Sequence, residues 1–178
     1  MNALRIFRVP VLAALVWMSL PATAAAQFDQ GKKFVGAHVG LSGVGSAAAL
    51  GVNGEFAYNE NIGIGAWLDT WGYGQDYTGI GGGNWNVRYV SIAATGAWHF
   101  PIESNPKLDP FAGLAVGYFV VSSSWDESSA SVSFAGSGSR VFIDGVAGLR
   151  YHFKQNLSGV IRAGASVSYL TVGVDLII

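Results

Sequence analysis

The 178-residue chain has a formal net charge of −1, no cysteine, 12% charged residues and 51% hydrophobic residues. The absence of cysteine excludes a disulfide scaffold, a thiolate metal site and a lipid-anchored N-terminal cysteine, and the charge balance offers no basic face for nucleic acid. Soluble domains carry roughly 25% charged residues. This chain therefore lacks the usual surface of a soluble domain.

The N-terminal residues have the features of a secretory signal peptide. A basic start precedes an apolar run at 9–20, and the small residues of "PATAAAQ" follow it. This pattern predicts a signal peptide over residues 1–26, cleaved after Ala26 or, as an alternative, after Ala24. Residues 27–178 are then predicted to form one domain.

The remaining sequence alternates between apolar and small or polar residues with a period of two, which predicts strands. In the first segment, "FVGAHVGLS", Val35 and Val39 lie on one face and His38 on the other. Seven further segments repeat the pattern, which gives eight strands at 34–42, 50–58, 62–71, 88–100, 110–121, 141–153, 157–165 and 170–178. One face of each segment is continuously apolar, and the other consists mainly of Gly, Ala, Ser and Thr with isolated charges.

The connections alternate between short and long. Short ones are expected at 59–61, 101–109 and 154–156, and the others at 43–49, 72–84, 122–139 and near Ser166. Strands in lipid must close into a barrel to pair their backbone groups, and bacterial barrels have short periplasmic turns. We therefore predict an all-β fold, an eight-stranded antiparallel up-and-down transmembrane β-barrel. It would lie in a Gram-negative-type outer membrane with periplasmic N- and C-termini.

Charged residues on the inward face are expected to find partners inside so narrow a barrel. The predicted lumen polar network consists of His38, Glu55, Arg150, Arg162 and Asp175. A structural ion-pair plug is the first interpretation of this network, and a gated proton or ion path is the alternative. Asp69 and Asp144 are expected nearer the outer mouth, as hydrogen-bonding groups.

A histidine stands between two aromatic residues in both "WHF" and "YHF". Alternation turns His99 and His152 into the lumen, on strands that another strand separates. With no carboxylate expected at their height, no metal site is predicted. The flanking aromatics would face lipid as a periplasmic aromatic girdle, which consists of Trp98, Phe100, Tyr151 and Phe153.

The long loop 122–139 holds the candidates for extracellular contacts, Trp125, Asp126, Glu127 and Phe134. These residues would bind a cell-surface partner or pack on the barrel rim. Arg88 is expected just above the outer interface, within reach of lipopolysaccharide phosphates. The glycines at 79–84 lack the spacing and the Lys-Ser/Thr of a phosphate-binding loop.

Two stretches carry a resemblance to a known family. "GAWHFPIESNPKLDPFAGLAVGYF" resembles the signature of the small outer-membrane β-barrel family, with OmpA-, OmpX- and opacity-protein-like domains. "AGLRYHFKQNLSGVIRAG" resembles a later hairpin of that family. One departure is Ile178, because such barrels usually end in a Phe that the barrel-assembly machinery reads.

The expected function is non-enzymatic, with a structural or adhesin-like role carried by extracellular loops. A narrow porin-like channel for small solutes or ions is the alternative, and a lipid A-modifying enzyme is the third candidate. A deacylase would need a Ser–His–acid set facing lipid, and the lipid-facing positions hold neither histidine nor carboxylate. We expect no cofactor, metal or catalytic residue. The expected partners of this monomer are outer-membrane lipids, lipopolysaccharide, the barrel-assembly machinery and a cell-surface partner.

Overall fold

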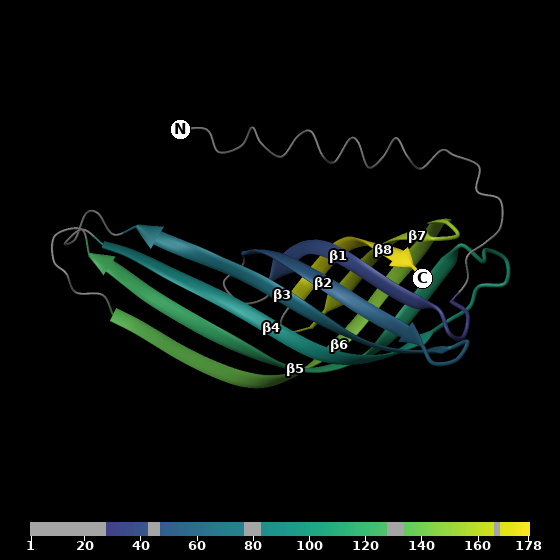
Figure 1. Cartoon of the computed structure of the whole chain (residues 1–178), viewed down its shortest axis with the longest axis horizontal. Helices are drawn as coiled ribbons and strands as arrows, with labels where there is room; N and C mark the ends of the chain where they lie inside the picture. Colours follow the sequence, from purple (N-terminus) through teal and green to yellow (C-terminus); the bar gives the residue numbers. More distant parts are fainter. Residues whose placement is uncertain (1–27, 43–46, 77–82, 128–133, 166–167) are drawn as a thin grey trace.

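The computed structural model describes residues 28–42, 47–76, 83–127, 134–165 and 168–178. These residues form eight antiparallel strands: β1 (Lys33–Ser42), β2 (Ala48–Ala57), β3 (Ile62–Asp76), β4 (Gly83–His99), β5 (Leu108–Glu127), β6 (Phe134–Lys154), β7 (Leu157–Gly164) and β8 (Ser168–Ile177). Each strand pairs with the next, and β1 pairs with β8, which closes the barrel (Figure 1). The predicted eight-stranded up-and-down barrel is confirmed. The predicted signal peptide and the turn near Ser166 lie outside the described residues.

The two faces of the strands follow the predicted alternation. Large apolar side chains point outward, with Val39 and Ile92 each 56% exposed and Leu114 63% exposed. The residues between them point into the barrel and are mostly buried or half-buried. Among the described residues no helix has the length and apolar composition needed to cross a bilayer.

Four strands continue well past the closed part of the barrel. The pairing of β2 with β3 ends at Ala49 and Trp71, and the pairing of β6 with β7 ends at Val146 and Gly164. Beyond these points β3–β6 stay paired with one another, and Figure 1 shows them projecting together to one side. We call this four-stranded part the extension; it comprises residues 72–76, 83–88, 122–127 and 134–137. The three short turns, β2–β3, β4–β5 and β6–β7, lie at the opposite end of the barrel, which we call the short-turn end.

Two of the loops are therefore predicted too long. In the predicted loop 72–84, β3 runs to Asp76 and β4 begins at Gly83. In the predicted loop 122–139, β5 runs to Glu127 and β6 begins at Phe134. Glycine and serine are typical of loops, but here they occupy positions paired across four neighbouring strands, so the ladder continues through them.

An aromatic ladder on the inner face lies at the base of the extension. Trp71 stacks on Tyr89 with ring centroids 5.1 Å apart, and Tyr89 lies 6.4 Å from Phe119. Phe119 in turn lies 6.2 Å from Phe142. One ring thus comes from each of β3, β4, β5 and β6, and these contacts hold the four strands together where the barrel opens.

Candidate functional site

The lumen of the closed part holds a polar network, to which every strand contributes a residue. We call this set the lumen network; its members are His38, Asn53, Glu55, Asp69, His99, Asp109, Arg150, Arg162 and Asp175. All of them stand at inward positions of the alternating pattern. Charges in so narrow a space persist only as mutual partners.

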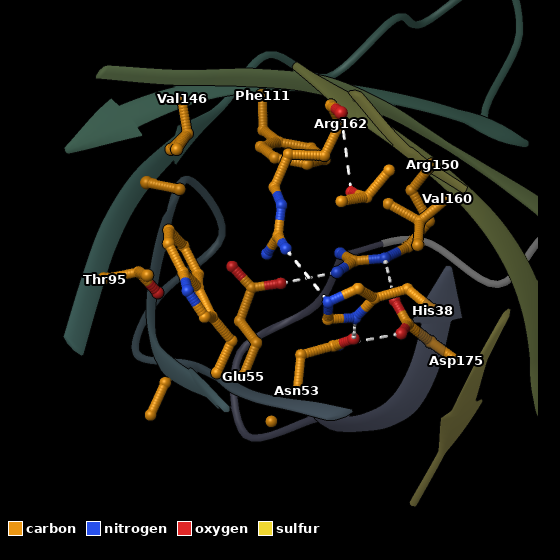
Figure 2. A pocket seen from close by; sticks show the side chains of 15 residues that line it. His38, Asn53, Glu55, Thr95, Phe111, Val146, Arg150, Val160, Arg162 and Asp175 are labelled. Atoms are coloured by element: carbon orange, nitrogen blue, oxygen red, sulfur yellow. Dashed lines mark hydrogen bonds and ion pairs between the residues drawn. The ribbon is translucent and has the colours of Figure 1, made fainter. Parts of the chain in front are cut away.

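Arg150 is the centre of the network (Figure 2). Its Nε donates to Asp175 Oδ2 at 3.0 Å, and its Nη2 donates to Glu55 Oε2 at 2.6 Å. Its Nη1 donates to Asp109 Oδ2 at 3.1 Å. The guanidinium carbon also lies 4.1 Å from the centroid of the Phe34 ring. A single buried cation thereby links β6 to β2, β5 and β8.

His99 bridges two of the same carboxylates. Its Nδ1 lies 2.7 Å from Asp109 Oδ1, and its Nε2 lies 3.1 Å from Glu55 Oε1. Because ionised carboxylates only accept hydrogen bonds, both ring nitrogens act as donors in this arrangement. The Phe28 ring stacks on the imidazole with centroids 3.5 Å apart, so an aromatic residue from outside the strands covers this end of the network.

His38 organises the second half of the network. Its Nε2 lies 2.6 Å from Asp69 Oδ1, and its Nδ1 lies 3.0 Å from Asn53 Oδ1. Arg162 approaches the same ring, with Nη2 3.4 Å from His38 Nε2, and its guanidinium covers the Trp67 ring. Asn53 Nδ2 donates to Asp175 Oδ1 at 2.9 Å, which joins this half to that of Arg150 (Figure 2).

Inward glycines make the space in which these side chains meet. Gly51 is paired with His38 on one side and with Asp69 on the other. A Cβ at this position would lie 2.0 Å from Asp69 Oδ1 and 2.3 Å from His38 Nε2. Gly36 leaves similar room for Asp175. The abundance of glycine on the inward face is thus a packing requirement of the network.

The structure brings all five predicted lumen residues, His38, Glu55, Arg150, Arg162 and Asp175, into one network. Sequence reasoning missed Asn53, His99 and Asp109 as members, and it placed Asp69 too far toward the outer mouth. The expectation that no carboxylate lies near His99 is wrong, since Glu55 and Asp109 both contact it. The predicted turn 101–109 includes Asp109, whereas Asp109 is the second residue of β5.

His152 does not join the network. Both of its ring nitrogens are buried without a hydrogen-bond partner in the described structure, as is Ser158 Oγ opposite it. Among the described residues no group of three or more His, Cys, Asp or Glu side chains has a geometry that could hold a metal ion.

The other predicted sites fall at the two ends of the barrel. Trp98, Phe100 and Tyr151 are exposed on the outer face beside the short turns, and Phe153 packs edge-on against Tyr151. At the far end, the backbones of Trp125 and Phe134 are paired in the extension. Asp126 and Glu127 are the last two residues of β5.

The network leaves little open space. The cavity between its members has a volume of about 40 Å³, which suffices for a few water molecules. Chemically, this arrangement cross-links strands and neutralises buried charge. It offers no room for an organic substrate.

Comparison with solved structures identifies the fold. Ail of Yersinia pestis, in complex with the heparin analogue sucrose octasulfate, matches with a TM-score of 0.59 and 12% identity over 84% of this chain and 99% of that chain. A major outer membrane protein of Thermus thermophilus matches with a TM-score of 0.58 and 14% identity, over 83% and 99% of the two chains. This chain has the fold of the small outer-membrane β-barrels. OprG of Pseudomonas aeruginosa also shares it, with a TM-score of 0.53 and 14% identity over 86% and 93%. No protein-family model and no curated protein matches the sequence.

Proposed function

We propose that this chain is an integral outer-membrane β-barrel of a Gram-negative-type envelope. In this proposal the extension makes contacts at the cell surface, the termini are periplasmic, and the protein has no enzymatic activity. The open extension above a closed and filled barrel is the observation that carries the proposal.

The outer face supports residence in a bilayer. Exposed apolar side chains such as Val39, Ile92 and Leu114 lie all around the closed part. The aromatic side chains of Trp98, Phe100 and Tyr151 gather at the short-turn end, as in an interfacial girdle. Between the two ends of the closed part, the charged side chains of the described residues point into the lumen, so an apolar solvent is the natural environment of this surface.

The extension supports a role in surface contacts. Among the described residues, β3 beyond Trp71 lacks a paired strand on its β2 side, and β6 before Asp144 lacks one on its β7 side. Such open edges present unpaired backbone groups that bind extended segments of other chains. Tyr73 and Trp85 add exposed aromatic surface, at 38% and 42% exposure.

The two other candidate functions receive less support. A channel needs a continuous water path, whereas the cavity between the members of the lumen network has a volume of only about 40 Å³. A lipid A deacylase would need a Ser–His–acid set facing lipid. All three histidines of the chain, His38, His99 and His152, are buried in the lumen.

The proposal is tested by shortening the extension without disturbing the barrel. Gly74 is paired with Asn86, and Ser124 with Ala135. Short Asn-Gly turns replacing 75–85 and 125–134 therefore rejoin strands that already face each other. This variant lacks Trp85 and all four predicted contact residues, Trp125, Asp126, Glu127 and Phe134.

Bacteria producing the full-length protein should adhere to epithelial monolayers or to one another more than bacteria producing the shortened variant. Both proteins should be inserted equally in the outer membrane, which protease accessibility and gel mobility check. Equal adherence would overturn the surface role. Stepwise conductance of the purified protein in planar bilayers would favour the channel, and a change in lipid A mass on expression would favour the enzyme.

We propose that the barrel-assembly machinery inserts the chain by recognising β8. Closed pairing of β1 with β8 leaves no edge within the barrel itself, which supports a monomer.

A further inference from the structure

A groove at the base of the extension, next to the exposed apolar band, is lined mainly by residues at outward positions of the strands. It has a volume of about 870 Å³ and is bordered by Leu50 and Thr70 on the side of the band. Its polar part contains Asn86, Arg88, Ser122, Ser124 and Ser137. The groove therefore joins an apolar surface to one rich in hydroxyl and amide groups.

Arg88 is the one charged residue among the described residues that line this groove. It is exposed, and no described residue forms a hydrogen bond or ion pair with its guanidinium. Its neighbours across the sheet are Gly72 on β3 and Ser122 on β5, and Ser122 is paired with Ser137. These small residues leave the guanidinium open on both sides, so that its planar fork is free to bind an oxyanion.

The height of Arg88 fits the headgroup layer of the outer leaflet. Phe100 follows it by twelve positions and lies at the short-turn end of the same outward face. At about 3.4 Å per residue and a strand tilt of about 40°, this corresponds to about 31 Å along the bilayer normal. The hydrocarbon core of a bilayer is about 30 Å thick. When the aromatic girdle lies at one interface, Arg88 lies at the other.

The groove is far larger than a phosphate group, and its hydroxyls and amide suit a sugar. We propose that it binds the phosphorylated saccharide headgroup of an outer-leaflet glycolipid, with Arg88 on a phosphate. Ser122, Ser124, Ser137 and Asn86 then contact sugar hydroxyls, and the acyl chains lie along the apolar band. This inference rests on the proposed outer-membrane location.

The test uses the purified full-length barrel in detergent micelles, followed by ¹⁵N NMR of the arginine Nε–H groups. Bisphosphorylated lipid A is titrated in, with its enzymatically dephosphorylated form, phosphatidylglycerol and inorganic phosphate as parallel titrations. Arg88→Gln identifies the Arg88 resonance. Arg140→Gln is the matched control, since Arg140 is an exposed arginine at an inward position of β6.

The Arg88 resonance should shift and saturate with bisphosphorylated lipid A, and the affinity should fall as ionic strength rises. Arg88→Gln should weaken binding about tenfold or more, because it removes a charge-assisted contact, whereas Arg140→Gln should leave binding unchanged. Equal binding of dephosphorylated lipid A, phosphatidylglycerol or inorganic phosphate would overturn the glycolipid assignment, as would unchanged affinity in Arg88→Gln.

Failure of this inference is distinguishable from failure of the proposed function. The gel mobility of the same samples reports whether the barrel is folded, and fractionation reports whether it reaches the outer membrane. A folded outer-membrane barrel without selective lipid A binding would refute the proposed glycolipid binding and leave the proposed function intact. A protein absent from the outer membrane would refute the proposed function.

Discussion

The closed barrel and the extension share four strands but are held together by different interactions. In the barrel, the buried ion pairs and hydrogen bonds of the lumen network connect all eight strands. At the base of the extension, an aromatic ladder connects only β3–β6. A closed ring of strands can enclose charges so that they become one another's partners. An open sheet with two edges cannot enclose anything, and it packs flat rings on one face instead.

This difference assigns the stability of the fold to the barrel and the binding of partners to the extension. The cavity between the members of the lumen network has a volume of only about 40 Å³, and removal of Arg150 takes from three buried carboxylates the cation that they share. The extension has exposed rings, open edges and a groove at its outer base, so its surface remains available. We therefore expect substitutions in the lumen to change folding and substitutions in the extension to change binding.

The largest effect is expected for Arg150→Ala. The substitution leaves Glu55, Asp109 and Asp175 without their shared cation, and removing one partner of a buried ion pair costs about 3–5 kcal/mol. Urea unfolding in lipid vesicles, followed by tryptophan fluorescence, measures the loss. Arg140→Ala removes the same charge from an exposed site and should be nearly neutral. If the two variants unfolded at the same urea concentration, the lumen network would not be what holds the barrel.

A smaller effect is expected for Gly51→Val, which inserts a side chain between His38 and Asp69. Overpacking of this kind costs about 1–3 kcal/mol. Gly145→Val is the control, because a Cβ at Gly145 meets no atom within 4 Å. The same unfolding assay should separate the two variants, and an equal cost for both would contradict the packing role of the inward glycines.

The smallest effect is expected for Phe119→Leu, which removes one ring from the aromatic ladder. Aromatic pairs contribute about 0.5–1.5 kcal/mol beyond the area they bury, and here the loss should be local. Hydrogen exchange should become faster in residues 72–76 and 83–88, while β1, β2, β7 and β8 keep their protection. Uniformly faster exchange would show that the two regions unfold as a single unit.

The sequence predicted which side chains point inward, because alternation alone decides the face of a strand. His38, Glu55 and Arg162 all lie where this pattern placed them. It did not predict which of these residues meet, since that depends on how far each strand is staggered against the next. Asp69 meets His38 because Gly51 stands between them in the register. Asp109 was missed because the preceding proline-containing turn was extended through it.

The main error of the sequence analysis was to miss the extension. Its strands differ in how clearly their sequences indicate a strand. On β4, the alternating Trp85, Val87 and Tyr89 indicate that the strand begins before residue 88. On β6, residues 136–139 alternate glycine and serine without any apolar side chain, which resembles a loop. Pairing with the neighbouring strand keeps this segment extended, and such tertiary support is not visible in the local sequence.

The most direct test of the central claim compares the mobility of boiled and unboiled protein on SDS gels, using protein extracted from the outer-membrane fraction. A closed eight-stranded barrel with a cross-linked lumen should resist SDS without heating, so the unboiled form should migrate faster than the boiled form. Identical mobility of the two forms, or absence of the protein from the outer-membrane fraction, would contradict the account.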